Sequence, residues 1–346
     1  MSPSGTAADA GIMATVEQTS RSAAPDRRTL WSVFRAATRA PSVHNTQPWR
    51  WVADGVRLDL FSDLDRLLPG TDPRGRQQMI SCGAILHHVI TASVAHGWAV
   101  ATERFPDPGD PDHLARLTLR PAEGPVPDDT ERTRAMDRRY SDRLAMLPLT
   151  DPRPVMARLR AAVLPFEQEF EVLDPAVRPR LASLSDRHTA TRRDDPFYQQ
   201  ELSWWTGHSE GPDGISAQAL ASASEYGRTD VGRAFPPAQG SDRRPGLADQ
   251  ATLALISSYG DSPRQWLLAG EALSAVLLDC TVAGLSTCPL THVTELDAER
   301  RMLAMLLPEA GALPQVLVRI GTAPEGEEPP PPTPRRPLTD VVEFRA

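Results

Sequence analysis

Two stretches of this 346-residue chain repeat one pattern of small and apolar residues, and the repeat narrows the folds open to the chain. Each stretch begins a helical pattern at a Gly and reaches a second Gly fourteen residues later. The glycines are Gly83 and Gly97 in the first stretch and Gly270 and Gly284 in the second. Chance could produce one such match, because Gly and Ala are common. Two related α+β units fused in tandem explain it better.

Hydrophobic periodicity arranges the remaining elements around these two helices. Helical patterns cover residues 27–39, 154–164, 175–193 and 296–307, and a further helical stretch ends near Arg143. Short apolar runs predict strands at 114–119, 170–173, 251–257 and 315–320. The dipeptide Asp54-Gly55 lies between two further apolar runs and predicts a tight β-hairpin.

These elements predict two units in one chain. The predicted divisions are a disordered tail at 1–26, a first unit at 27–120, an acidic, Pro-rich linker at 121–129, and a second unit at 130–346 with a C-terminal tail at 322–346. The hydrophobic periodicity fades over 194–249, yet this stretch keeps aromatic residues that a free linker would not need. We therefore expect a lid there, a long loop with aromatic anchors.

Composition excludes several classes of function. A net charge of -8 without a basic cluster argues against a nucleic-acid partner. All 37 basic residues are Arg, which excludes a lysine Schiff base, pyridoxal phosphate attachment and a P-loop lysine. Three cysteines without a CxxC pair predict a reducing, cytoplasmic setting. No apolar run approaches the roughly 20 residues that span a bilayer, so no membrane partner is expected. The sequence offers no metal ligand set, and a metal-dependent hydrolase is set aside.

The polar loop between Pro41 and Pro48 is the strongest candidate for a binding surface. Each proline restricts the residue before it to extended backbone, so the loop is expected to be stiff and non-helical. Such a loop can hold Ser42, Asn45 and Gln47 at fixed angles. Their donors and acceptors suit the edge of a planar heterocycle such as a flavin pyrimidine ring. Alternatively, these side chains only satisfy nearby backbone groups in a turn that ends a helix.

The same loop carries a resemblance to a known family. Ala40-Pro41-Ser42 followed by Asn45-Thr46-Gln47-Pro48-Trp49 resembles the flavin-contacting motif of the nitroreductase superfamily. Within it, the chain most resembles the long, single-chain Acg-type branch of FMN-binding proteins in actinobacteria. The resemblance implies an α+β nitroreductase fold in which the two units form an intramolecular pseudo-dimer. It further implies a monomer, or a weak homodimer.

Two arginine-rich segments are candidates for holding a phosphate, which Arg can bind through two N–H groups at once. Arg138, Arg139 and Ser141 resemble the Arg-Arg-Ser-x-Arg signature that binds the FMN phosphate in nitroreductases. A solvated, charged helix end is the alternative. Arg335 and Arg336 resemble the second basic pair of that phosphate site, and the sequence leaves open which of the two has the role.

A third segment follows the second repeated helix. In the family, the turn that matches residues 284–292 lies against the flavin ring, which implies that Pro289 and Leu290 face it. The alternative is ordinary helix termination by Gly and Pro. Because the first unit has no counterpart of the Arg-Arg-Ser-x-Arg signature, we expect one FMN per chain.

The resemblance implies an FMN-dependent oxidoreductase that passes a hydride through flavin N5 to an electron-poor small molecule. The reductant would be NAD(P)H, bound transiently because the chain has no GxGxxG motif for a Rossmann domain. The expected lid, with Trp204, Trp205, Gly214 and Ile215, would cover the flavin and restrict entry. The alternative is a flavin-sequestering or redox-sensing protein that does not catalyse turnover.

Overall fold

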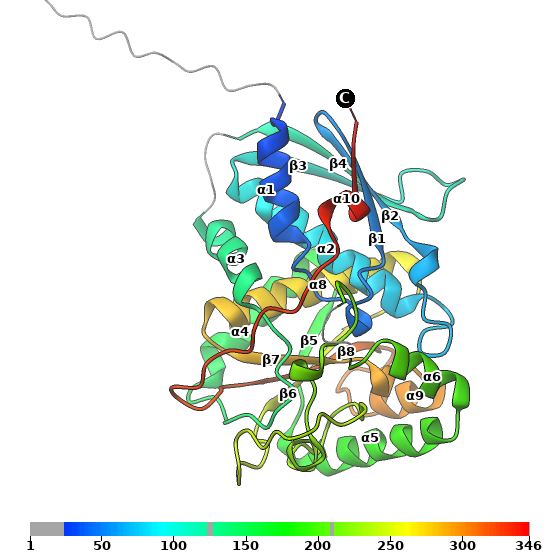
Figure 1. The fold of residues 1–346 in the computed structure, drawn as a ribbon, viewed down its shortest axis with the longest axis vertical. Coiled ribbons are helices and arrows are strands. Elements are labelled where there is room, and N and C mark those ends of the chain that lie inside the picture. The colour runs from blue at the N-terminus through cyan, green and yellow to red at the C-terminus, as the bar shows by residue number, and fades with distance from the viewer. Residues whose placement is uncertain (1–23, 123–126, 208–210, 346) are drawn as a thin grey trace, which may run out of the picture.

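The computed structural model describes residues 24–122, 127–207 and 211–345. The predicted tail at 1–26 therefore lies outside the described residues up to residue 23. Of the predicted linker at 121–129, residues 123–126 lie outside them, and the part from residue 127 on is helical rather than a linker. Two sheets form the frame, with strand orders β3-β4-β2-β1-β9 and β5-β6-β8-β7, and their pairings are antiparallel except that of β1 with β9. In Figure 1 the long helices α2 and α8 cross the middle of the molecule, between the two sheets.

The two sheets are built by the same succession of elements. The first unit runs through β1 (Trp49–Asp54), β2 (Arg57–Ser62), α2 (Arg76–Ala95), β3 (Trp98–Arg104) and β4 (His113–Pro121). The second runs through β5 (Glu169–Val172), β6 (Thr252–Ser258), α8 (Pro263–Val282), β7 (Ser286–Leu290) and β8 (Leu313–Gly321). Corresponding strands occupy corresponding places in the two sheets. The predicted tandem arrangement of α+β units is confirmed.

A close crossing of α2 and α8 joins the two units. A Cβ added to Gly83 would lie 1.9 Å from the carbonyl oxygen of Leu267, and one added to Gly270 would lie 1.9 Å from that of Ile80. Each contact is the mirror of the other, as at a two-fold interface between identical subunits. The Nδ1 atom of His87 also lies 2.8 Å from the hydroxyl of Ser274, its counterpart 187 residues later. The repeated glycines therefore mark an internal pseudo-two-fold axis.

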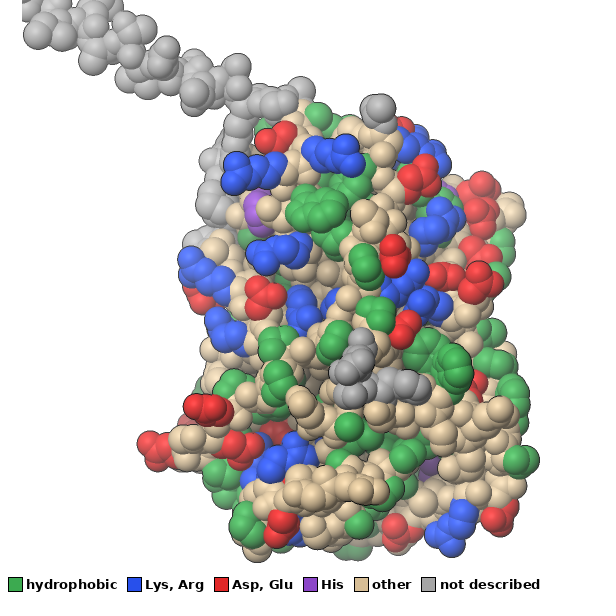
Figure 2. All heavy atoms as spheres, viewed as in Figure 1, with side chains coloured by type: hydrophobic (Ala, Val, Ile, Leu, Met, Phe, Trp, Pro, Cys, Tyr) green, Lys and Arg blue, Asp and Glu red, His purple; other side chains and the backbone are tan. Residues whose placement is uncertain are grey.

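The remaining helices cover the frame. They are α1 (Arg27–Ala37), α3 (Pro127–Arg138), α4 (Pro152–Val163), α5 (Arg178–Arg193), α6 (Pro196–Trp204), α7 (Ala223–Tyr226), α9 (Asp297–Ala304) and α10 (Leu338–Val341). Three clusters of buried apolar residues fill the interior: one under the first sheet and one on each face of the second. On the face shown in Figure 2, Arg side chains are interspersed with Asp and Glu and form no continuous stripe.

Sequence patterns missed three strands, misplaced one helix end and missed the helix α6, which lies inside the stretch 194–249 that was expected to be a long loop. β3 and β7 follow directly on the two long helices, and Pro289 obscured β7 because Pro is tolerated mainly on edge strands, as here. The third strand, β9 (Val342–Phe344), pairs parallel to β1 and returns the C-terminal segment to the first sheet. The helix expected to end near Arg143 ends at Arg138, because Ser141 already forms a β-bridge to Thr287.

The two long helices also correct an expectation about apolar length. By length and mean hydropathy, both α2 and α8 could cross a bilayer, although neither contains an unbroken apolar run. In the fold, 78% of the apolar window of each helix is buried inside the protein. The apolar surface of these helices is thus used by the core between the sheets (Figure 1).

Candidate functional site

The loop after α1 has an unusual backbone. Its residues His44, Asn45 and Gln47 have φ values of 48°, 56° and 51°, in the left-handed region that L-residues seldom adopt. Two hydrogen bonds hold this shape: the backbone N–H of Gln47 donates to the hydroxyl of Ser42 at 3.0 Å, and that of Val43 donates to the hydroxyl of Ser81 on α2 at 3.1 Å. Strained backbone of this kind is concentrated at functional sites.

Three arginines from distant parts of the chain meet beside this loop, and we call them the arginine cradle: Arg39, Arg139 and Arg335. Arg335 donates to the backbone carbonyls of Thr38 at 2.9 Å and Arg39 at 3.2 Å. Arg139 donates only to the carbonyl of Arg39, at 3.4 Å, and its Nε and Nη1 groups are buried without a partner.

The electrostatics of the cradle call for an anion. Burial and the neighbouring charges of Arg39 and Arg143 lower the pKa of Arg139 to about 10. Burial, Arg39 and Arg139 lower the pKa of Arg335 well below its ordinary value. Like charges crowded in a buried place are costly unless a counter-charge joins them. Among the described hydrogen bonds and ion pairs, Arg139 and Arg335 make none to a carboxylate.

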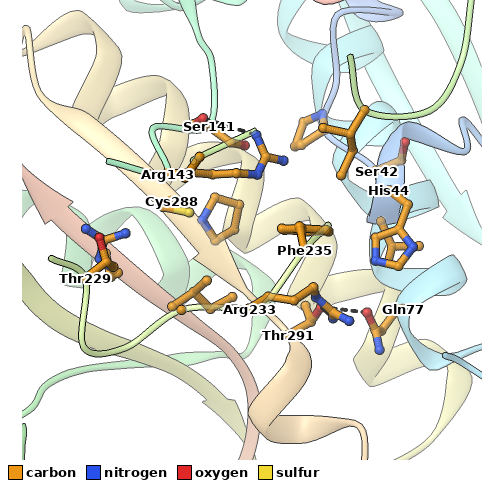
Figure 3. Close-up of a pocket in the computed structure, with 18 of the residues that line it drawn as sticks. Ser42, His44, Gln77, Ser141, Arg143, Thr229, Arg233, Phe235, Cys288 and Thr291 are labelled. Carbon is orange, nitrogen blue, oxygen red and sulfur yellow. Dashed lines mark hydrogen bonds between the residues drawn. The ribbon is translucent and has the colours of Figure 1, made fainter. Parts of the chain in front are cut away.

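Two connected cavities extend from the cradle. The first, of about 440 Å³, is lined by the cradle, Ser141 and Asn45, and we call it the arginine cavity. The second, of about 300 Å³, lies between α2, β7 and residues 215–237, and we call it the lid cavity. They share Ser42, His44 and Arg143. Figure 3 shows Ser42 and His44 on one side of the lid cavity, with Arg143 and Cys288 on the other.

Several predicted site residues line these cavities. Ser42, Asn45, Arg139, Ser141 and Arg335 line the arginine cavity, whereas Ser42, Ser141, Ile215, Pro289 and Leu290 line the lid cavity. The bridge from Ser141 to Thr287 brings the arginine-rich segment against β7. Of the arginine pair near the C-terminus, Arg335 is therefore the one that lies in the cradle.

The amides of Asn45 and Gln47 do not present their donors to an open cavity. The Nδ2 of Asn45 donates to the carbonyl of Gly214 at 2.9 Å, and the Nε2 of Gln47 donates to that of Pro212 at 2.9 Å. The Oε1 of Gln47 accepts the backbone N–H of Arg336, also at 2.9 Å. These side chains fasten the expected lid and the C-terminal segment to the loop, because both segments offer backbone groups at close range.

Other predicted residues lie away from the cavities. Arg138 is exposed at the end of α3, and Arg336 faces Asp63 at 3.4 Å. Trp204 is 70% exposed on α6, while Trp205 uses its carbonyl to accept the N–H of Ile215 at 2.8 Å. A sequence motif gives the order of these residues but not the direction of each side chain.

The structure adds functional candidates that the sequence analysis did not select: Arg39, His44, Arg143 and Arg233. Arg233 lines the lid cavity, and its guanidinium pairs with the buried carboxylate of Glu295. His44 lies between the two halves of the loop motif, and Arg143 ends the arginine-rich segment, but only their positions beside a cavity distinguish them. Arg39 directly precedes the first half of the loop motif.

The opposite side of the pseudo-two-fold axis holds a buried ion pair next to a third cavity, of about 640 Å³, that Arg104 also lines. Glu271 of α8 is fully buried there, and Arg104 at the end of β3 binds both of its carboxylate oxygens at 2.7 and 2.8 Å. We call this pair the ion-pair plug. It lies where the pseudo-symmetry would place a second lid cavity, since Glu271 and Arg104 are the counterparts of Ala84 and Thr291.

Comparison with known proteins gives the family. Two Mycobacterium tuberculosis proteins that carry the name "Putative NAD(P)H nitroreductase" are similar to this chain along most of their length. The first, acg, is 44% identical over 316 residues, which cover 91% of this chain and 95% of the relative. The second is 38% identical over 330 residues, which cover 92% of each. The chain belongs to the nitroreductase superfamily, in the Acg-type branch of long, single-chain actinobacterial proteins.

Solved structures give more distant matches. The FMN-dependent nitroreductase NfnB from Mycobacterium smegmatis, solved in complex with NADPH, is 14% identical, with a TM-score of 0.41 over 63% of this chain and 99% of that protein. A nitroreductase with bound FMN from Bacteroides fragilis is 19% identical, with a TM-score of 0.35 over 57% of this chain and 91% of that protein. No protein-family model matches the chain.

Proposed function

We propose that this protein binds FMN across the two cavities and acts as an NAD(P)H-dependent oxidoreductase on an electron-poor small molecule. The observation that carries the proposal is the arginine cradle, in which Arg139 holds two buried N–H groups without a partner beside Arg39 and Arg335. A phosphate monoester supplies both the negative charge and the acceptor oxygens that such a cluster needs.

The residues of the site fit the rest of the cofactor. Arg139, Arg335 and Ser141 would hold the phosphate in the arginine cavity, and Pro289 and Leu290 would face the ring in the lid cavity. When bound, FMN supplies a ring that accepts a hydride and passes electrons to an acceptor. The chain contributes the binding groups, a buried position and the exclusion of water. Asn45 and Gln47, predicted to hold the ring edge, are proposed instead to hold the lid and tail closed around the site.

The relatives named as NAD(P)H nitroreductases support the class of reductant, and the two-unit fold supports one complete site per chain. The ion-pair plug fills the position of a second site. We accordingly propose one FMN per chain, in a protein that already contains its dimer-like interface. The buried thiols of Cys82, Cys280 and Cys288 support a reducing compartment such as the cytoplasm.

The absorbance spectrum of purified protein tests the cofactor assignment. Oxidised flavin absorbs at about 450 nm, and we expect one FMN per chain to be retained through gel filtration. Arg139→Gln should weaken FMN binding about 10- to 100-fold, the effect of losing charge-assisted hydrogen bonds. Its neighbour Arg138 is exposed, so Arg138→Gln is the matched control and should retain FMN. A colourless protein that takes up no added FMN would rule the cofactor out.

A second function, flavin sequestration or sensing without turnover, is favoured by one observation. The described lid residues close on the site, since Gly214 and Pro212 are hydrogen bonded to Asn45 and Gln47. Anaerobic stopped-flow mixing with NADPH separates the two functions. Loss of the oxidised-flavin band at about 450 nm on mixing supports the oxidoreductase, whereas a band that persists supports sequestration.

A further inference from the structure

His44 is a buried polar side chain that points into the lid cavity and has no hydrogen-bond partner. It is 5% exposed, and neither ring nitrogen makes a hydrogen bond within the described structure. Figure 3 shows its ring directed into the cavity, on the side opposite Arg143. A buried imidazole normally satisfies at least one nitrogen, because an unmade hydrogen bond in a desolvated place is costly. Because the ring faces a cavity, a molecule that enters the cavity can supply the missing partner.

The backbone of His44 supports the same conclusion. Its φ of 48° costs free energy for a residue other than Gly, and neighbouring hydrogen bonds hold the loop in this shape. The ring then packs edge-on against Phe235 from the lid, with centroids 5.9 Å apart. A side chain held in a strained position against an aromatic wall is preorganised to meet a ligand.

The charges around the cavity fix the form of the imidazole. Burial and the positive charge of Arg233 lower the pKa of His44 to about 3; Glu295 acts in the opposite direction and Arg143 adds to the effect of Arg233. The ring is thus neutral at physiological pH, with one nitrogen donating and the other accepting. Among the described residues that line the lid cavity, none is Asp or Glu. A cation would find no counter-charge there.

Resting on the proposed function, we propose that His44 binds the electron acceptor by donating a hydrogen bond from a neutral imidazole to an acceptor oxygen. The cavity then selects planar, electron-poor molecules that carry a nitro or carbonyl oxygen and no positive charge. Phe235 provides an apolar face beside them, and Arg143 favours a neutral or anionic substituent, whereas the charge of Arg233 is already paired with Glu295. In this arrangement His44 is a binding and specificity residue, because no proton need leave it.

Calorimetric titration of the FMN-loaded protein, in air and without reductant, tests the proposal. The probes are 4-nitrobenzoate, 4-nitrobenzyl alcohol and 4-nitrobenzylamine, which share a nitroaromatic ring and differ in charge. We expect the anion and the neutral alcohol to bind at least about tenfold more tightly than the cation, because Arg143 lines the cavity and none of its described lining residues is a carboxylate. Equal affinities for all three would overturn the charge selection.

Two variants isolate the imidazole. His44→Gly removes the side chain and relieves the strained φ, so it is expected to fold; it should weaken binding of the alcohol about tenfold. His44→Asn keeps donor and acceptor groups and tolerates left-handed backbone, so binding should stay within about threefold of wild type. His96→Asn, in a residue outside both cavities, is the control and should bind as wild type does.

The outcomes are distinguishable. FMN retained with unchanged probe affinity in His44→Gly would overturn the role of His44 and leave the proposed function standing. FMN lost from His44→Gly would place the imidazole against the cofactor and overturn its contact with the acceptor. Wild-type protein that takes up no FMN would overturn the proposed function, and the acceptor role with it.

Discussion

The two ends of the α2–α8 pair are related by the internal pseudo-symmetry, and two pairs of counterpart residues illustrate how they differ. At the lid cavity the lining residues are Ala84 and Thr291, and at the opposite end their counterparts are Glu271 and Arg104. A small side chain and a short hydroxyl leave space, whereas a carboxylate and a guanidinium fill the same space with an ion pair. Side chains at these counterpart positions therefore make the two ends unlike while the backbone frame stays the same.

The connections between corresponding strands also differ in length between the two units. β1 and β2 are joined by a tight turn at Gly55, whose φ is +58°. The corresponding connection, from β5 to β6, contains α5, α6, α7 and the segment that lines the lid cavity. The longer connection thus lines the lid cavity, whereas the short turn adds no such segment at the end that holds the ion-pair plug.

We expect the largest effect on stability at the crossing of α2 and α8, on which both ends of the helix pair depend. Gly83→Ala would place a Cβ 1.9 Å from the backbone oxygen of Leu267, and Gly270→Ala would repeat the clash at Ile80. Backbone atoms cannot rotate away, so α2 and α8 must separate. We expect each change to lower the free energy of unfolding by about 3 kcal/mol or more, measured by urea denaturation.

Gly227→Ala is the matched control for this crossing. Its added Cβ would meet nothing closer than 3.4 Å, an ordinary van der Waals contact, and its φ of -62° suits any residue. Its stability should stay within about 0.5 kcal/mol of wild type. Similar losses in all three variants would mean that the crossing is no tighter than an average helix contact.

The next effect tests the ion-pair plug. Glu271→Ala leaves the guanidinium of Arg104 without its partner in a place where that side chain is 23% exposed. Breaking a fully buried pair costs more, so with this partial exposure we expect a loss of about 2 kcal/mol in the free energy of unfolding. Glu167→Ala, which breaks the exposed pair to Arg264, should cost less than about 0.5 kcal/mol.

Glu271→Ala also sharpens the comparison of the two ends. Space alone does not make a flavin site, because the plugged end has no arginine cradle. FMN content should remain at one per chain in this variant, measured by absorbance against protein concentration. A content approaching two would show that the plug, rather than the absence of a phosphate site, excludes the second cofactor.

The two-unit frame could be predicted from the sequence, but the difference between its two ends could not. Helical periodicity and the spaced glycines predict two long core helices, because local pattern and close packing leave the same signature in the chain. The motif around Ser42 and Asn45 predicted a binding site, and both residues line the arginine cavity. Side-chain direction escaped prediction: Asn45 and Gln47 turn to the lid and tail, because partners 165 or more residues away determine those bonds. The cradle residue Arg39 was missed for the same reason.

A smaller effect is the pH dependence of stability that arises from His44 at the lid cavity. The pKa of His44 is lowered to about 3 at the lid cavity, mainly by burial, so below its ordinary value of 6.5 the unfolded chain binds a proton that the folded chain refuses. The contribution of His44 to the free energy of unfolding is therefore fully present above pH 6.5. It falls by about 1.4 kcal/mol per pH unit as the pH is lowered toward 3. His87 near the pseudo-two-fold axis contributes in the same direction, because burial lowers its pKa to about 3 as well.

Urea denaturation between pH 6.5 and 4.5 measures that slope. His44→Asn removes one of the titrating groups and should reduce the slope by about 1.4 kcal/mol per pH unit, whereas His96→Asn should leave it unchanged. His188 opposes the trend, since its hydrogen bonds to Glu295 and Glu299 outweigh burial and raise its pKa. An unchanged slope in His44→Asn would mean that His44 is protonated or exposed in the folded protein.

The smallest effect concerns the cradle, which exists at one end only. In FMN-free protein, the crowded charges of Arg39, Arg139 and Arg335 should be relieved by inorganic phosphate, so phosphate should raise Tm in scanning calorimetry. The free energy of unfolding should increase by about 1 kcal/mol at a phosphate concentration several times its dissociation constant. Chloride at equal ionic strength should not reproduce this increase. Arg139→Gln should abolish the response and Arg138→Gln should keep it, because only the buried arginine faces the cavity. A response that survives Arg139→Gln would place the anion elsewhere, and the two ends would then differ in volume alone.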